Sequence, residues 1–371
     1  MRFVIFTHSL VSDWNHGNAH FLRGVASELF ERGHDVRILE PRNGWSRQNL
    51  IAAYGEDPIA EFHRFYPRIR SAFYDETTLN LDDQLDGADV VIVHEWNSHQ
   101  LVRRIGEYRA AHATFQLYFH DTHHRSVTDP DSMAQYDLRH YDGVLAYGEV
   151  IRELYLRNRW ATDAWTWHEA ADTRIFHPRA VAGQSGDVVW IGNWGDEERS
   201  REIREFLIEP VKALRLKAKV YGVRYPENAL NELADAGIEY GGWLPNYRVP
   251  GVFARYKVTV HIPRRPYVER LPGIPTIRPF EALACGIPLI SAPWNDAEHL
   301  FRSGLDFLMA RDGEEMAAHL QILLDDPDLA DYIAHHGLER IRTRHTCAHR
   351  VDELLGIARN GVTAQMTQGA R

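Results

Sequence analysis

The sequence predicts an α/β protein with two doubly wound parallel sheets, one in each of two domains. Short apolar runs typical of buried parallel strands alternate with helical patterns over residues 1–178, and the same alternation returns over 187–345. Between them, RAVAGQSG at 179–186 is small and polar, which is typical of a linker. A chain of 371 residues is long enough to bury two cores. We therefore expect two domains, followed by a terminal helix at 346–360.

The composition indicates a soluble globular protein and argues against several other classes. Hydrophobic residues make up 44% and charged residues 25% of the chain, and the net charge of −10 argues against a general nucleic-acid or anionic-membrane binder. Two cysteines are too few for a disulfide framework, which favours a reducing compartment. The chain begins with a predicted strand at 3–6, and its apolar runs fall short of the roughly 20 residues that span a bilayer. We expect a cytoplasmic protein without a transmembrane segment.

The first domain is predicted to open with a strand, a glycine-bearing loop and a helix. Gly17 and Asn18 stand at the mouth of this helix, and Asn is a good N-cap residue. The first turn between strand and helix is a usual ligand position in doubly wound sheets, although the GxGxxG pattern of dinucleotide sites does not occur in it. Residues 41–86 are irregular and rich in aromatic side chains, and we expect helices there.

Polar residues follow two buried strands of this domain. The strands expected at 88–93 and 115–119 both end in polar runs, the second in HDTHH, and a helix is expected further on at 149–157. Open α/β sheets place their sites at the carboxyl ends of strands, so we expect His120 and Asp121 to face a ligand. A metal site is the alternative, but adjacent residues on an extended segment point to opposite sides, and no HExxH spacing occurs. We therefore predict no metal ligands.

The second domain repeats the alternation, with basic residues after two of its strands. The turn GNWGDEERS carries Asn193 and leads to Arg199, at the start of a helix expected over 199–216. Arg199 either binds an anion or solvates this Glu-rich helix, and the sequence leaves both interpretations open. A strand at 257–262 leads into a loop that carries Arg264, which is suited to a phosphate because a helix start follows closely.

Residues 276–292, TIRPFEALACGIPLISA, predict a helix followed by a short buried strand. Pro279 suits the first turn of a helix, and Gly286 suits its end. The N-terminus of such a helix presents free N–H groups and a partial positive charge, which suit a phosphate. Arg278 at this end can add a charge-assisted bond, and Glu281 can accept hydrogen bonds from a ribose. The alternative is a surface helix whose Glu only complements the helix dipole.

This stretch resembles the donor-site signature of GT-B-fold glycosyltransferases, and TIRPFEALACG is similar to the spore-maturation-type branch of that superfamily. Weaker likenesses lie at 14–36, which resembles the family's opening loop and helix, and at 165–178, which resembles its interdomain signature. The resemblance implies two Rossmann-like domains that face a central cleft, the first for the acceptor and the second for the nucleotide-sugar donor, with the terminal helix packed back on the first domain. Gly273 stands where retaining members usually carry a glutamate that holds the sugar hydroxyls.

The resemblance implies a hexosyltransferase that moves a sugar from a nucleotide-sugar to a hydroxyl of an unidentified acceptor, which is a glycan, a lipid, a protein or a small molecule. It places Glu281 at the ribose, Arg199 near the diphosphate and His120 beside the sugar. Trp243 stands where the family contacts the base, and it either stacks there or packs in the core. The predicted site comprises His120 and Asp121 for catalysis and, for the donor, Gly17, Asn18, Asn193, Arg199, Trp243, Arg264, Thr276, Arg278 and Glu281.

The same resemblance implies that neither a cofactor nor a metal is needed at the chemical step. We expect retention of configuration, in which the leaving phosphate itself takes the acceptor proton. Inversion would instead need a protein base, for which His120 or Asp121 is the candidate. Two alternatives to a transferase are a non-hydrolysing nucleotide-sugar epimerase on the same fold and a weakly active nucleotide-sugar-binding protein.

Overall fold

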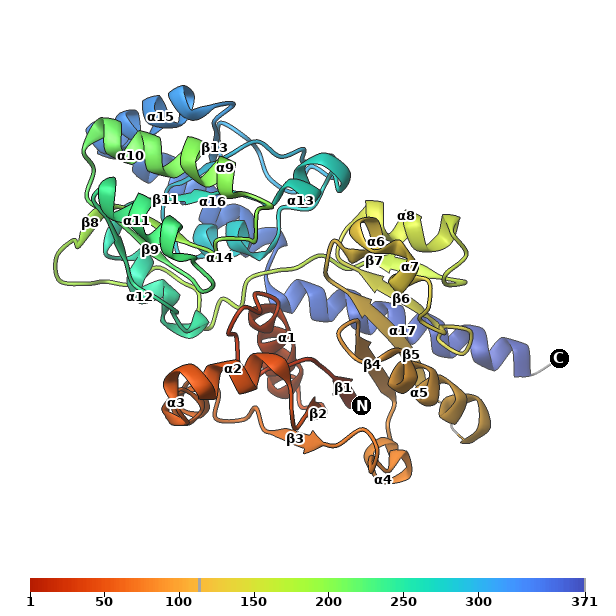
Figure 1. Ribbon diagram of the computed structural model, residues 1–371. Helices are drawn as coiled ribbons and strands as arrows, with labels where there is room; N and C mark the ends of the chain where they lie inside the picture. Colours follow the sequence, from red (N-terminus) through yellow and green to blue (C-terminus); the bar gives the residue numbers. More distant parts are fainter. Residues whose placement is uncertain (113–114, 370–371) are drawn as a thin grey trace. The chain divides into compact units, whose positions relative to one another are not determined.

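The structure is a computed structural model that describes residues 1–112 and 115–369, with side chains described as far as residue 359 (Figure 1). The chain divides into two compact units. Unit 1 holds Met1–Glu169 together with Cys347–Arg371, and unit 2 holds Ala170–Thr346. The boundary thus falls at Glu169, earlier than the expected end of the first domain at 178, because the segment after it pairs with the end of unit 2 through a bridge from Ala171 to Thr346.

The described part of unit 1 contains a parallel sheet of seven strands in the order β3-β2-β1-β4-β5-β6-β7. The order reverses between β1 and β4, which pair from Phe3 with Val90 to Phe6 with Val93. Loops after these two strands therefore leave toward different faces, which is the place where doubly wound sheets bind ligands. The strands are β1 (Arg2–Phe6), β2 (Asp35–Pro41), β3 (Ser71–Tyr74), β4 (Val90–His94), β5 (Gln116–Asp121), β6 (Gly143–Ala146) and β7 (Ala164–Thr166).

Several helices of unit 1 pack against strands of this sheet (Figure 1). In α1 the residues at helical spacing, Leu22, Val25 and Leu29, are all buried, and Gly33 with φ of +78° follows the end of the helix. The last helix, α17, contacts α1 and β5, and the Trp167 indole donates to the carbonyl of Arg350 at 2.8 Å. The helices are α1 (Ala19–Glu31), α2 (Trp45–Tyr54), α3 (Asp57–Phe65), α4 (Leu81–Leu85), α5 (His99–His112), α6 (Arg125–Thr128), α7 (Pro130–Met133), α8 (Glu149–Arg157) and α17 (Cys347–Gly369).

The segment 41–86 differs in part from the expectation of helices alone. Helices α2 and α3 are present, but β3 also lies here and forms the edge of the sheet. β3 pairs only with β2, from Ile38 with Ser71 to Pro41 with Tyr74, and its first three residues keep contact with solvent. An edge strand of this kind needs no continuous apolar run, so the sequence gives it little signal.

The described part of unit 2 contains a six-stranded parallel sheet in the order β10-β9-β8-β11-β12-β13, which reverses between β8 and β11. Its core packs Trp190, Phe206 and Val260 with residues of the flanking helices. The strands are β8 (Gly186–Ile191), β9 (Ala218–Tyr221), β10 (Ile238–Tyr240), β11 (Tyr256–His261), β12 (Leu289–Ser291) and β13 (Leu308–Met309). The helices are α9 (Ser200–Ile203), the π-helix η1 (Arg204–Ile208), α10 (Glu209–Leu214), α11 (Glu227–Asp235), the 3-10 helix η2 (Asn246–Arg248), α12 (Val249–Phe253), α13 (Arg265–Arg270), α14 (Ile277–Ala284), α15 (Gly313–Asp325) and α16 (Pro327–Arg344).

Two elements of unit 2 differ from the sequence prediction. The single helix expected over 199–216 is interrupted by η1, because Pro210 has no N–H to donate to the preceding turn and a wider turn accommodates it. The segment after Arg264, expected as a loop, is the short helix α13, whose first N–H at Arg265 donates to the Glu198 carbonyl at 2.9 Å. This bond ties the loop after β11 to the loop after β8. Within the described residues, none of the helices is both long enough and apolar enough to span a bilayer.

Candidate functional site

The loop after β8 in unit 2 wraps around the side chain of Arg199. Gly195, Asp196 and Glu197 all have positive φ, so the chain turns sharply here. A Cβ on Gly195 would lie 2.9 Å from Arg199 Cγ, which explains the need for glycine. The Arg199 guanidinium donates to the Asn193 carbonyl, at 3.1 Å from Nε, and to the Ile262 carbonyl, at 2.9 Å from Nη1. Arg199 therefore joins the ends of β8 and β11.

Three arginines share this edge of the unit 2 sheet. Burial and, to a smaller extent, the nearby charges of Arg264 and Arg278 lower the pKa of Arg199 to about 9. Burial also lowers the pKa of His261 to about 3, with Arg199 and Arg278 contributing, so this imidazole is neutral. Arg264 pairs with Glu198 at 2.8 Å. Of the predicted donor-binding residues, the structure thus brings Arg199, Arg264 and Arg278 into one positive cluster, which we call the arginine cluster. Guanidinium groups in such an arrangement suit a diphosphate.

Helix α14 begins beside this cluster, at Ile277 rather than at Pro279. Thr276 precedes it with φ of 63° and ψ of 180°, which is strained for a β-branched residue. Its side chain makes no capping hydrogen bond, so this backbone conformation sets the course of the loop and does not cap the helix. Gly273, with φ of +92°, lies earlier in the same loop, and a Cβ there would lie 2.5 Å from Glu298 Oε1. A side chain at position 273 would therefore need Glu298 to move and would be strained by the positive φ.

Glu281 is fully buried, with both carboxylate oxygens engaged. Oε1 accepts from Asn246 Nδ2 at 2.8 Å, and Oε2 accepts from Arg278 Nη1. The alternative of a surface helix with an exposed Glu is therefore wrong. The ribose role stays a prediction, and a ribose hydroxyl would have to replace one of these two bonds.

Asn193 and Trp243 take different places around the site. The Asn193 side chain accepts from the Val223 N–H at 2.9 Å and so joins the loops after β8 and β9, which is a supporting position. Trp243 lies half-buried between β10 and η2. Its role at the base stays a prediction.

In unit 1, histidines meet at the ends of three strands and in the loop after β1. His94 and His120 stand opposite one another in the β4–β5 register, with ring centroids 5.3 Å apart. His16 is 6.1 Å from His94, and His8 is 5.0 Å from His16. Burial lowers the pKa of His120 to about 3 and that of His8 to about 4, and it lowers the pKa values of His16 and His94 well below 6.5. This histidine cluster is therefore uncharged at neutral pH.

His120 and Asp121 are both fully buried, but their surroundings differ. His120 packs against Trp167 at 5.0 Å, and both of its ring nitrogens lack a hydrogen-bond partner in the described structure. Asp121 accepts from Tyr155 OH at 2.9 Å and from the His123 N–H at 3.1 Å. Neither residue lies open to solvent, so the structure does not present them as the cleft-facing pair that the sequence predicts.

The sequence interpretation missed Glu95, which lies beside Asp121. Its Oε1 accepts from the Thr122 N–H at 2.8 Å. Burial and the Asp121 charge raise the pKa of Glu95 well above 4.5, and burial raises the pKa of Asp121 to about 6. Two buried carboxyls at adjacent strand ends cannot both ionise readily, so the charge of one disfavours ionisation of the other. The sequence held a signal for Glu95, because it follows the buried strand β4 directly, just as Asp121 stands at the end of the neighbouring strand β5.

Gly17 and Asn18 lie in the loop before α1. Gly17 is exposed, and its carbonyl accepts from the His20 N–H at 3.3 Å. Asn18 occupies the N-cap position, but its side chain does not cap the helix; Nδ2 instead donates to Glu169 Oε1 at 3.0 Å. The N-cap prediction for the side chain is therefore wrong, because Glu169, which is distant in sequence, competes for it.

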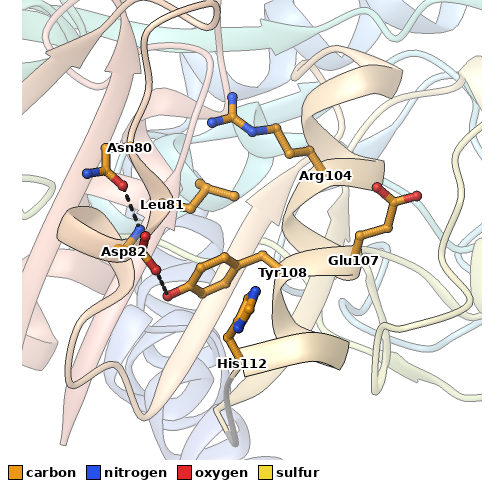
Figure 2. A pocket seen from close by; sticks show the side chains of 7 residues that line it. All are labelled: Asn80, Leu81, Asp82, Arg104, Glu107, Tyr108 and His112. Carbon is orange, nitrogen blue, oxygen red and sulfur yellow. Dashed lines mark hydrogen bonds between the residues drawn. The ribbon is translucent and has the colours of Figure 1, made fainter.

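The parts of the chain that the structure describes contain no group of three or more His, Cys, Asp or Glu side chains placed to hold a metal ion, and metal independence stays a prediction. A cavity of ≈ 360 Å³ lies between α4 and α5, where Tyr108 OH donates to Asp82 Oδ1 at 2.9 Å (Figure 2). It is also lined by His112, close to the start of β5, so it lies away from the carboxyl ends of the strands. None of the predicted site residues lines it.

Comparisons with known proteins give one family and many similar structures. Residues 199–356 match the model of a family described as "Glycosyl transferase-like". Sucrose-phosphate synthase from Thermosynechococcus elongatus is 14% identical with a TM-score of 0.67, over 98% of this chain and 100% of that one. Anabaena HepE, in complex with UDP and glucose, is 13% identical with a TM-score of 0.68, over 97% and 100%. An alpha-glucosyltransferase in complex with UDP and a 13-mer DNA is 10% identical with a TM-score of 0.70, over 96% and 99%. No curated protein sequence matches.

Proposed function

We propose that this chain, a glycosyltransferase of the GT-B fold, transfers a hexose from a nucleoside diphosphate-sugar to a hydroxyl of an acceptor. The observation that carries the proposal is the arginine cluster, in which three guanidinium groups meet beside the start of α14. As the bond between the anomeric carbon and the phosphate oxygen breaks, negative charge grows on the diphosphate. Fixed cations and helix N–H groups stabilise that charge without reorganising. UDP-glucose is the first donor to test, because the HepE structures hold UDP, glucose and UDP-glucose.

The environment of His120 and Asp121 supports retention of configuration. An inverting enzyme needs a base whose pKa lies near the working pH. His120, with a pKa of about 3, is a weak base. Asp121, with a pKa of about 6, meets this criterion better, but both of its oxygens already accept hydrogen bonds, from Tyr155 and from the His123 N–H. In a retaining reaction, the leaving diphosphate takes the acceptor proton while the acceptor oxygen bonds to the anomeric carbon on the same face. We therefore propose retention, with His120 and Asp121 shaping the sugar site rather than moving a proton.

The proposed reaction uses no metal, because the arginine cluster and α14 supply the positive charge that a cation would otherwise supply. We also propose an acceptor other than a nucleic acid. The alpha-glucosyltransferase was solved with DNA, but its 10% identity carries only the fold, and the net charge of −10 here disfavours a polyanion.

Two measurements test the proposal. Calorimetric titration should show that UDP binds far more tightly than uridine, since the phosphates supply the contacts to the arginine cluster. UDP release from UDP-glucose should depend on an acceptor and should persist after treatment with EDTA. An epimerase would convert the donor without an acceptor, and a binding protein would hold it unchanged. Proton NMR of the product should show the anomeric configuration of the donor, and an inverted product would refute retention.

A further inference from the structure

We propose that the carboxylate of Glu198 competes with the diphosphate for the guanidinium of Arg264 and thereby sets the affinity of the donor site. The inference rests on the proposed function, because it concerns the diphosphate of the same donor. It gives a role to the acidic run Asp196, Glu197 and Glu198, which stands directly before an arginine of the arginine cluster. Carboxylates repel phosphates, so an acidic run at such a place needs an explanation of its own.

The acidic run meets the arginine cluster through one of its three side chains. Asp196 pairs with Arg224, which lies outside the cluster, at 3.0 Å. The Glu197 carboxylate accepts from the hydroxyl of the first residue of α9 at 3.0 Å. Glu198 pairs with Arg264 at 2.8 Å. A ligand that binds to the cluster therefore meets competition from Glu198.

The backbone of Glu198 is held on both sides, so its side chain is the part that can turn. Its N–H donates to the carbonyl of Gly195, which has a φ of +93°, at 2.9 Å. Its carbonyl accepts from the Arg265 N–H at 2.9 Å, where the loop before α9 meets the start of α13 (Figure 1). Release of Arg264 therefore needs a rotation of the Glu198 side chain and leaves the loop in place.

The three arginines of the cluster differ in how easily they can turn to a phosphate. Arg199 donates to two backbone carbonyls, which stay in place. Arg278 pairs with Glu281, which is fully buried, so breaking this pair would leave a carboxylate charge out of water. The side chains of Arg264 and Glu198 are 24% and 31% exposed, so a displaced Glu198 can turn into water. Arg264 is therefore the arginine whose counter-ion a phosphate can replace.

The competition acts on every ligand that carries the diphosphate. A phosphate that takes Arg264 has to exceed the attraction of the carboxylate, so UDP binds less tightly than the arginine cluster without Glu198 would hold it. When UDP leaves after the transfer, Glu198 pairs with Arg264 again, and this return favours release of the product. Uridine has no phosphate, so the competition does not affect its binding.

Calorimetric titration of the full chain with UDP and with uridine tests this competition. Glu198→Gln is expected to bind UDP at least about threefold more tightly than the unmodified chain and to bind uridine equally well. Asp196→Asn is the matched control, because it removes one negative charge from the same loop and Asn tolerates the φ of 47° at this position. Its UDP affinity should change by less than about 1.5-fold, since salt screens a charge whose partner lies outside the cluster.

A double variant separates the competition from a general effect of charge. In Arg264→Gln the two groups have no guanidinium to compete for, so adding Glu198→Gln should change the UDP affinity by less than about 1.5-fold. A threefold increase in this background would overturn the inference. Thermal unfolding and uridine titration show that each variant keeps its fold.

Two other results overturn the inference and leave the proposed donor site standing. In one, the unmodified chain binds UDP and Glu198→Gln binds it no more tightly. In the other, Asp196→Asn tightens UDP binding as much as Glu198→Gln does. If neither the unmodified chain nor Glu198→Gln bound UDP, the proposed donor site and this inference would both be refuted.

Discussion

Glu281→Gln is expected to destabilise unit 2 as well as to weaken donor binding. The carboxylate is fully buried and joins Asn246 to Arg278, so it has a structural role in addition to the predicted contact with a ribose. Glutamine has the same shape but only one acceptor oxygen. Whichever way its amide turns, one of the two partners then faces an N–H group instead of an oxygen.

The magnitude follows from the bonds that are lost. A charge-assisted hydrogen bond contributes about 1.5–3 kcal/mol, and a buried donor left unsatisfied costs about 1–3 kcal/mol. These two effects overlap, and Arg278, whose side chain is 17% exposed, regains some hydration, so we expect a loss of about 3 kcal/mol. For a unit of this size, each kcal/mol lowers Tm by about 2–4 °C, which gives a decrease of about 6–12 °C.

Differential scanning calorimetry measures this loss, with Glu339→Gln as the control. Glu339 pairs with Arg342 across one helical turn at 3.1 Å, but their side chains are 43% and 55% exposed. An exposed pair of this kind contributes about 0–1 kcal/mol, so the control should lose at most about 2–4 °C. If Glu281→Gln lowered Tm no more than Glu339→Gln does, the structural part assigned to the buried pair would be refuted. UDP titration of the folded variant at low temperature then isolates the contact with the ribose.

Three further outcomes are expected. Arg264→Gln should weaken UDP binding by about tenfold and leave uridine binding unchanged in calorimetric titration, because the side chain can meet only the phosphates. The free energy of unfolding should fall as the pH drops from 7 to 5, because the unfolded chain takes up protons near pH 6.5 that the buried imidazoles of the folded chain do not bind. His120, with a pKa of about 3, contributes about 1.4 kcal/mol of this loss per pH unit below 6.5. His120→Gln should therefore give a flatter dependence of the unfolding free energy on pH, measured by urea unfolding. The buried carboxyls oppose this pH dependence to the same extent in the unmodified chain and in His120→Gln. Gly222→Ala should lower the free energy of unfolding in urea by at least about 2 kcal/mol, because the added Cβ would lie 2.1 Å from the Gly192 carbonyl oxygen. Gly237→Ala should lower it by only about 1 kcal/mol, because a Cβ there meets nothing within 4 Å.

Elements with a strong periodic or apolar signal could be predicted closely. The helix expected at 149–157 occurs as α8 with the same bounds, and the expected strands at 88–93 and 115–119 occur as β4 and β5, shifted by one or two residues. The GT-B fold is confirmed. β3 and β10 were missed because edge strands pair on one side only and need no apolar run on both faces.

The candidate site was predictable in its residue types but not in its partners. Arginines that follow parallel strands come together because the carboxyl ends of those strands meet at one edge of the sheet, and the sequence shows this order. Glu281 is held by Asn246, and Asp121 is held by Tyr155, through contacts between elements that are far apart in sequence. Burial and pairing of this kind have no local signal, which is why both carboxylates were expected to be open to ligands.

The two units differ in the charge that their strand ends hold, and the difference matches the needs of the proposed reaction. A leaving diphosphate gains negative charge, so it needs cations that stay charged at neutral pH; Arg199 does so even with its pKa lowered to about 9. An acceptor hydroxyl is neutral and needs only hydrogen bonds, which the uncharged imidazoles around His120 can supply. The burial that makes His120 a poor base also keeps the histidine cluster uncharged at neutral pH, so one physical cause favours both retention and a neutral acceptor group.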